Sequence, residues 1–207
     1  TYLNVLTADY EANPNYAVTV ETGDFEIRTA SIEGAELNAE GGSWIYDGMA
    51  HEAKAELTNA PGYTIYYKTG NGDWSTTAPS VTNVSDGLVT VSVKATKTGY
   101  KDLTADDVTL KITPRTATIT VNNAEKFFDE PDPVFTGKVT GLVKDGDIGT
   151  VSYKRTNSEE AVGTYKKVLT AEFTDNSNYD VTVEKGDFQI KTAAIEGAAL
   201  TAAGGSW

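Results

Sequence analysis

Residue types that commonly perform catalysis are scarce in this chain. It has one histidine, His51, and no cysteine. A nucleophilic site of the Ser/His/Asp or Cys/His kind needs a histidine beside the nucleophile. His51 follows a turn, which favours a surface or packing role for its ring. The sequence therefore predicts that the protein is not an enzyme, with no catalytic and no cofactor-binding residue.

Carboxylates are abundant and gather in three places. The groups are Asp129, Glu130 and Asp132, then Asp145 and Asp147, then Asp106-Asp107. A glycosidase needs two carboxylates facing each other across a cleft, which spacing along a turn does not establish. Structural calcium at the loops between modules is the better alternative, because calcium prefers oxygen ligands. None of the runs has the spacing of a helix-loop-helix calcium site, so solvated acidic turns are the expected role and metal ligands stay unassigned.

Two other groups of residues suggest further chemistry. Trp44, Trp74 and Trp207 raise the alternative of a sugar-binding platform, although Trp44 and Trp207 each follow Gly-Gly-Ser at a strand start, which favours packing. A covalent bond between Lys126 and either Asn176 or Asn178 is conceivable in a rod that lacks cysteine. Such a bond would lower the intact mass by one ammonia per module.

The chain that carries these residues contains a long internal repeat. Residues 164–207 repeat residues 1–44 without insertion, with about two thirds of the positions identical. The distance from Trp44 to Trp207 gives a period of 163 residues. A fixed long period is typical of a modular array. Both ends of the sequence cut through the repeat, so we expect the chain to be one stretch of a longer array.

Strand patterns dominate the chain. Apolar and polar residues alternate over 88–95, 108–112, 117–121 and 179–183, as in half-buried strands. Asn71-Gly72 between apolar runs predicts a hairpin turn. The predicted fold is therefore all-β: small antiparallel sandwiches of immunoglobulin-like type in an elongated tandem array. A β-grasp-like variant is the alternative for the second module.

Closing hairpins are expected to end the modules. Tyr100–Ile112 and Tyr179–Ile190 share an aromatic start, a polar turn and an alternating last strand, and the second pattern recurs as Tyr16–Ile27. The short connectors after them lack the Gly/Ser runs of flexible tethers. We predict part of one module at 1–30, complete modules at 31–113 and 114–192, and the opening strand of another at 193–207.

The charge balance limits the partners. The chain has 17 Lys and Arg against 30 Asp and Glu, a net charge of −13. Nucleic acids and anionic membranes attract basic surfaces, so neither is an expected partner. No run approaches the ~18–20 apolar residues of a membrane span. We therefore expect no membrane insertion within this segment.

Both complete modules resemble repeats of large bacterial surface adhesins. Residues 114–192 resemble the MBG repeat through the run from Asp129 to Phe135, the run Gly141–Asp147 and the segment Asn178-Tyr179 to Ile190; Phe127-Phe128 stands where that family usually has Tyr-Gly. Residues 31–113 resemble the YDG-type, immunoglobulin-like repeat through Trp44–Gly48 and Lys97–Tyr100. The resemblance implies a tandem stalk at a bacterial cell surface or cell wall, with no catalytic residue.

The expected function is that of a stiff, non-catalytic spacer that packs against neighbouring repeats of the same protein. Each module would add reach, and short linkers would limit bending. One alternative is that the repeats bind a host glycan or protein by avidity. Another is self-association into a filament, with residues 1–30 completed by strands from a neighbour. No cofactor is expected, apart from the calcium alternative.

Overall fold

A computed structural model describes residues 1–194. The predicted all-β class is confirmed: these residues form strands, and their only helical element is a short 3-10 turn, η1 (Val84–Asp86). No helix in this range is long and apolar enough to cross a membrane. Of the predicted opening strand 193–207, residues 195–207 lie outside the described part of the chain.

The chain divides into two compact units. The first contains Thr1–Gly42, Glu52–Ser80 and Val89–Leu110, and the second contains Ser43–His51, Val81–Leu88 and the chain from Lys111 onward. Three segments of the predicted 31–113 module, 43–51, 81–88 and 111–113, thus group with the second unit. The boundary between the units falls inside four strands: β4 (Gly42–Ile45), β5 (His51–Glu52), β8 (Ser80–Val81) and β11 (Val108–Thr113).

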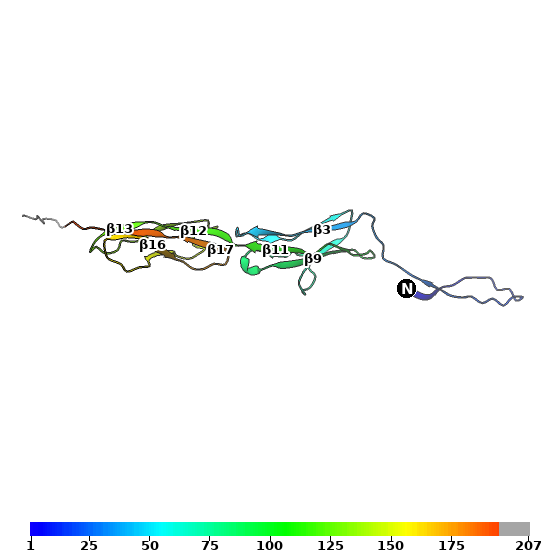
Figure 1. Cartoon of the computed structure of the whole chain (residues 1–207). Helices are drawn as coiled ribbons and strands as arrows, with labels where there is room; N and C mark the ends of the chain where they lie inside the picture. The colour runs from blue at the N-terminus through cyan, green and yellow to red at the C-terminus, as the bar shows by residue number, and fades with distance from the viewer. Residues whose placement is uncertain (195–207) are drawn as a thin grey trace, which may run out of the picture. The chain divides into compact units, whose positions relative to one another are not determined.

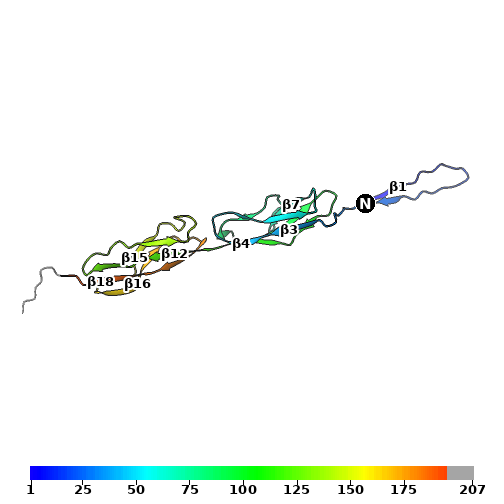
Figure 2. The same ribbon diagram turned by 90° about the horizontal axis from the view of Figure 1, so that it is seen from above.

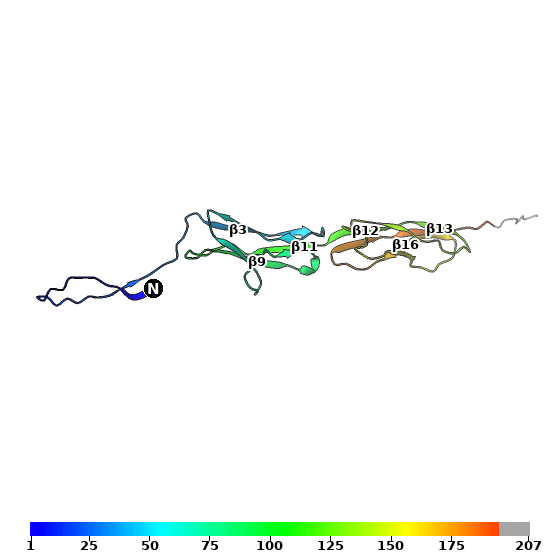
Figure 3. The same ribbon diagram turned by 180° about the vertical axis from the view of Figure 1, so that it is seen from behind.

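The first unit is built around one long central strand. β9 (Val89–Thr96) pairs antiparallel with β7 (Thr64–Thr69), β10 (Leu103–Thr104) and β11. β3 (Glu36–Glu40) and β6 (Lys54–Thr58) pair as a second layer, and Figure 3 shows β3 facing β9 and β11. Alternation along β9 buries Val91, Val93 and Ala95 and leaves the polar residues between them half-buried on the other face.

The second unit is a two-sheet sandwich. One sheet has the order β14 (Gly137–Thr140), β12 (Arg115–Val121), β17 (Tyr179–Glu184). The other has the order β13 (Ala124–Phe127), β18 (Gly186–Lys191), β16 (Gly163–Glu172), β15 (Ser152–Arg155). Figures 1 and 2 show the strands of both sheets running lengthwise through the unit. Ile119, Leu169, Phe188 and Ile190 form the centre of the core, with Ile148 added from a loop.

Strand pairing in this sandwich is mixed, whereas the sequence predicted antiparallel sheets. β12 pairs parallel with β17, from Arg115 beside Tyr179 to Thr120 beside Glu184, and β13 pairs parallel with β18. The other ladders are antiparallel. Parallel pairs arise here because the chain returns to each first strand after a long excursion through the other strands of the sandwich.

Both predicted closing hairpins in the complete modules are wrong. β10 and β11 do not pair with each other, because each pairs with β9. β17 and β18 lie in different sheets, and the chain crosses between them at Lys185. Alternation correctly identified the residues that face inward, but it carries no information on which strand lies beside which. The predicted turn at Asn71-Gly72 is present, closed by a Gly72 N–H bond to the Thr69 carbonyl at 3.0 Å.

Candidate functional site

His51 has a packing role. Its ring stacks on Trp44 with centroids 4.6 Å apart, and Nε2 lies 3.1 Å from Oδ1 of Asp47. The pKa of Asp47 is lowered, first because its carboxylate accepts a hydrogen bond from the Met49 N–H and second because of the His51 contact. These contacts fold the turn that carries Tyr46-Asp47-Gly48 and place no nucleophile beside the imidazole.

Trp44 and Trp74 each have another side chain over the ring. Trp44 is half-buried against His51. Trp74 is more exposed, but the ammonium groups of Lys94 and Lys68 lie 4.6 and 5.1 Å from its ring centroid. A sugar stacks on a free ring face, and here cations already occupy positions over the ring. Trp207 lies outside the described residues.

An ionic cluster of four side chains closes one end of the second sandwich. Lys126, only 7% exposed, lies 3.0 Å from Asp132 and also bonds Glu160. Arg155 bonds the same two carboxylates, with its Nε 3.2 Å from Asp132, and its guanidinium lies 4.9 Å from the ring centre of Phe188. Two cations sharing two carboxylates leave each charge compensated at the edge of an apolar core.

Sequence reasoning found only part of this ionic cluster. It singled out Lys126 and Asp132 for other chemistry and missed Arg155 and Glu160. These two residues come from β15 and the loop after it, far along the chain from Lys126. The structure supplies the reason: Lys126 lies on the inward face of β13, on the same side as Ala124, and a lysine in such a position needs a partner.

The ionic cluster predicts an acid-sensitive second unit. The pKa of Glu160 is lowered, first by its hydrogen bond from Lys126 and next by that from Arg155. A lowered folded pKa stabilises the protein above the unfolded value of about 4.3, and this contribution is lost as pH falls through the folded pKa. Urea midpoints measured by circular dichroism from pH 7 to pH 2 should therefore fall below about pH 4.5, and Glu160→Gln should flatten that fall. An unchanged pH profile in the variant would contradict this role.

Lys126 and the two asparagines are not brought together. Lys126 lies on β13 with its ammonium on Asp132 and Glu160, whereas Asn176 and Asn178 precede β17 and bond other groups. Figure 1 places β13 and the start of β17 toward opposite ends of the sandwich. The covalent bond that the sequence left conceivable between Lys126 and either asparagine is therefore not supported by this geometry.

Asn178 instead joins two distant segments of the second unit. Its side chain is 8% exposed, and its Oδ1 accepts a hydrogen bond from the Val84 N–H at 2.8 Å. Its Nδ2 donates to Oδ1 of Asn83 at 3.0 Å. Asn83 begins the 3-10 turn η1, whose Asp86 carboxylate accepts from the Asn83 and Thr82 N–H groups. Those backbone bonds lower the pKa of Asp86.

Tyr179, the residue after Asn178, makes further contacts within the second unit. Its hydroxyl donates to Asp147 at 2.5 Å and accepts from the Val143 N–H at 2.9 Å, and its ring meets that of Tyr46 edge-on at 5.4 Å. Burial, followed by the hydrogen bond to Asp147, raises the pKa of Tyr179. The hydroxyl therefore stays protonated at neutral pH and can hold the 143–147 loop in place. We call Tyr46, Asn83, Val84, Asn178 and Tyr179 the Asn178 cluster.

Removing the Asn178 amide should destabilise the second unit. Asn178→Ala leaves the half-buried Val84 N–H without its acceptor, which typically costs about 1–3 kcal/mol. Asn15 is the matched control, because it occupies the equivalent position of the repeat and is exposed. Asn15→Ala should change the free energy of unfolding by less than about 0.5 kcal/mol. Urea denaturation of both variants tests this, and equal effects would contradict it.

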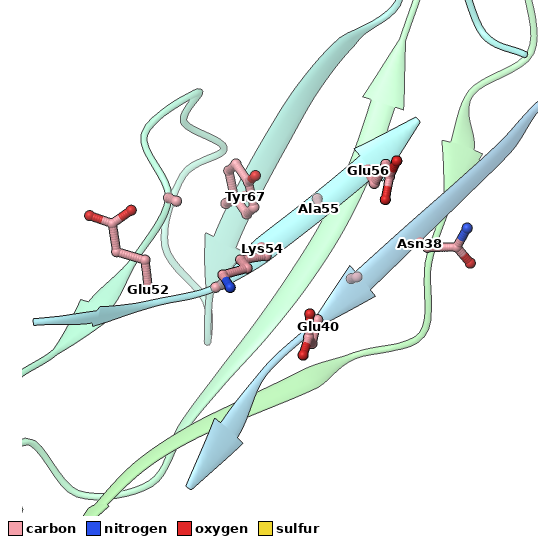
Figure 4. Close-up of a pocket in the computed structure, with 10 residues that line it drawn as sticks. Asn38, Glu40, Glu52, Lys54, Ala55, Glu56 and Tyr67 are labelled. Atoms are coloured by element: carbon pink, nitrogen blue, oxygen red, sulfur yellow. The ribbon is translucent and has the colours of Figure 1, made fainter. Parts of the chain in front are cut away.

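A hollow of about 560 Å³ in the first unit lies over β3 and β6. Figure 4 shows Asn38 and Glu40 on β3 and Lys54 and Glu56 on β6, with the Tyr67 ring nearby. Burial, and then the charge of Glu52, raise the pKa of Tyr67, so its phenol is no base at neutral pH. The residues lining this hollow include no nucleophile paired with a base.

The three carboxylate groups have separate uses. Asp132 bonds Lys126 and Arg155, Asp147 bonds Tyr179, and Asp106-Asp107 is exposed. Within residues 1–194 no three histidine, aspartate or glutamate side chains gather in a way that could hold a metal ion. Structural calcium at these loops therefore stays a prediction from the sequence.

Comparison with known proteins gives one match, to part of the second unit. No curated protein matches the chain. A family model does match: residues 117–189, which cover most of the second sandwich from within β12 to within β18, match the MBG domain (YGX type). This match confirms the resemblance predicted for that module. The MBG domain is a structural, non-catalytic repeat type found in bacterial surface proteins, and residues 117–189 of this chain are similar to it.

Proposed function

We propose that this chain is a stiff, non-catalytic spacer within a bacterial surface protein, and that it acts outside the cell. The observation that carries the proposal is the Asn178 cluster. It ties the segments 43–51 and 81–88, which belong to the predicted 31–113 module, to the MBG-like segment through hydrogen bonds and ring contacts. A spacer needs such direct contacts, because each one limits the bending between successive modules.

The connection at Pro114 supports the same proposal. Pro114 is the only residue between β11, which ends at Thr113, and β12, which begins at Arg115. The proline ring fixes its own φ and restricts the residue before it to extended conformations. The Thr113 hydroxyl also donates to the Trp44 carbonyl at 3.1 Å, and the Tyr46 N–H donates to the Thr113 carbonyl at 2.9 Å. A connection of this kind has little freedom to bend.

The proposed rigidity can be measured by pulsed electron resonance. Because the chain has no cysteine, Thr58→Cys and Ser158→Cys provide two unique, exposed label sites. We expect one narrow distance distribution between the two labels. Inserting Gly-Ser-Gly-Ser after Pro114, in a chain that also carries Asn178→Ala, should broaden it to the width expected of a flexible tether.

A matched control separates linker length from contact. The same insertion between Gly70 and Asn71 lengthens a surface turn and should leave the distribution narrow. If the unmodified chain already gives a distribution as broad as the chain with the insertion after Pro114, the spacer proposal fails.

Binding of glycan by avidity has weaker support, since Trp44 and Trp74 both have other groups over their rings.

A further inference from the structure

We propose that the open edge of β6 binds an extended segment of a second protein, which adds to β6 as a further β-strand. The segment carries an apolar residue opposite Ala55 and a basic residue opposite Glu56. This proposal goes beyond the spacer function and does not depend on it, because it concerns one edge of the first unit alone.

The two layers of the first unit differ in width. The layer that contains β9 is a five-stranded sheet, whereas β3 and β6 form a two-stranded sheet in the described chain. Val93 on β9 is buried, but its partner on β7, Tyr67, is only half-buried. The same contrast holds for Ala95 and its partner Ile65. The narrower layer therefore leaves the inner face of β7 partly uncovered.

β8 lies beside only the first part of the segment 51–58. It pairs with β5, and the Ala53 N–H donates to the Pro79 carbonyl at 3.0 Å. The chain before Pro79 belongs to the other layer, since Ser75 exchanges two backbone hydrogen bonds with Tyr67 on β7. The edge that continues from Ala53 along β6 therefore has no strand beside it in the described part of the chain.

The backbone of β6 presents hydrogen-bonding groups along this edge. Successive residues of a strand point their N–H and C=O groups to opposite edges, so Ala55 and Leu57 point theirs to the same edge as Ala53. Figure 4 shows the Tyr67 ring on that side of β6, with β3 on the other side. An edge that presents unpaired N–H and C=O groups is a template for an added strand.

Small side chains leave room between the layers for the apolar residues of an added strand. The hollow of about 560 Å³ is lined by the Tyr67 ring and by four alanines, Ala39, Ala53, Ala55 and Ala78. Residues placed opposite Ala55 and Leu57 point to the same inner face as these two residues do. Side chains of the size of leucine at those positions would cover Tyr67 and remove its ring from water, which favours binding.

The rim of the hollow is acidic. Glu40, Glu52 and Glu56 line it together with a single cation, Lys54. Lys54 lies directly opposite Glu40 in the ladder between β3 and β6, so the lining holds no second cation for Glu52 and Glu56. A basic residue of the added strand opposite Glu56 supplies that cation, because opposite charges on directly paired residues stabilise a sheet.

The edge of β6 is also regular, in contrast to two other ladders of the chain. β3 and β6 pair along their whole length without a shift in register. In the first copy of the repeat, β1 (Tyr2–Leu6) and β2 (Gly23–Phe25) shift register at a bulge where Asn4 has a φ of 56°. β16 and β18 shift at the equivalent residue, Lys167, which has a φ of 54°. Because a bulge hinders pairing with another chain, the straight edge of β6 is the better acceptor.

A second copy of the chain is a poor occupant of this edge. Two β6 strands paired antiparallel over their whole length place Glu56 opposite Glu56, and like charges at such positions destabilise the pair. A register shifted toward Ala53 drives the second strand into residues 78–79, which already occupy that part of the edge. A shift the other way meets the turn after β6, where Asn59 has a φ of 50°. The occupant is therefore a segment of a different protein with a basic central residue.

The test is a titration of the whole chain with the blocked peptide acetyl-Thr-Leu-Lys-Leu-Thr-amide, followed by NMR. The peptide has the same sequence in both directions, so either orientation places its leucines opposite Ala55 and Leu57 and its lysine opposite Glu56. With the peptide in excess, the amides of Ala55 and Leu57 should exchange with solvent at least about 10-fold more slowly. Replacing the lysine of the peptide by glutamate should raise its Kd at least about 5-fold at low salt.

Two variants of the chain make the test specific. Glu56→Lys should reverse the preference, so that the glutamate peptide binds at least about 5-fold more tightly than the lysine peptide. Ala55→Pro removes an N–H donor from the edge and should weaken binding of the lysine peptide at least about 10-fold. Amide exchange of Val93 and Ala95 reports whether each variant keeps its fold. If Ala55→Pro does not, Glu56→Lys decides the test.

Three results would overturn the proposal. The first is unchanged exchange at Ala55 and Leu57 in the presence of the lysine peptide. The second is equal affinity for the two peptides in both the parent chain and Glu56→Lys. The third is slow exchange at Ala55 and Leu57 without any peptide, together with a dimer in analytical ultracentrifugation, because the occupant is then a second copy of the chain.

Discussion

Replacing Phe188 by alanine is expected to lower the unfolding free energy of the second unit by about 3–5 kcal/mol. Phe188 is fully buried, meets the Phe135 ring edge-on at 5.7 Å and carries the Arg155 guanidinium over its face. The substitution removes these contacts and leaves a cavity between the two sheets. Native-state hydrogen exchange of the β16 and β18 amides, measured over a series of denaturant concentrations, gives the change directly.

Phe25 provides the matched control for this substitution. It occupies the equivalent position of the repeat and pairs with Tyr2 as Phe188 pairs with Tyr165, but about half of it is exposed. Phe25→Ala should therefore change the stability of either unit by less than about 1 kcal/mol. Comparable losses of stability in the two variants would contradict the difference in burial between Phe25 and Phe188.

The second large effect is expected at Gly186. A Cβ at this position would lie 2.6 Å from the Asn122 carbonyl oxygen and 2.8 Å from that of Val121. Both obstacles are backbone atoms of the chain leaving β12, so they cannot rotate away as a side chain would. Gly186→Ala should cost about 1–3 kcal/mol or more in the second unit, by the usual cost of overpacking.

Gly23 tests whether that cost comes from the neighbouring backbone. In the first copy the corresponding Cβ would meet only the Leu6 side chain, at 3.5 Å, which is an ordinary contact. Gly23→Ala should therefore be close to neutral, within about 0.5 kcal/mol. Urea denaturation of both variants measures the difference. If Gly186→Ala changes the unfolding free energy as little as Gly23→Ala does, this result contradicts the close approach of residues 121–122 to β18.

The sequence predicted the class of fold well because alternation reports burial. The expected strands at 88–95, 108–112, 117–121 and 179–183 all appear, within one or two residues at their ends. The repeat and the MBG resemblance also located the second sandwich. Pairing was not predictable in the same way, because β12 meets β17 across more than fifty residues of intervening chain. Such contacts depend on the shape of the whole core.

The contacts of the Asn178 cluster could not be predicted from the sequence either. The sequence suggested Asn178 only as a partner of Lys126 in a covalent bond. It suggested no role for Asn83 or Val84. Their contact depends on a 3-10 turn that starts at Asn83 and on the bend that Asn176 makes before β17. Neither local sequence pattern indicates that these two segments contact each other. A polar side chain with 8% exposure becomes meaningful only once its surroundings are known.

The bulge at Asn4 has a consequence for solubility. A flat, regular strand edge with exposed leucine and phenylalanine is a template for uncontrolled stacking of chains into aggregates. The positive φ of Asn4 interrupts the ladder between Tyr2 and Leu6, and the Asp24 carboxylate caps the Asn4 N–H there. A kinked, charged border of this sort resists indiscriminate β-sheet growth.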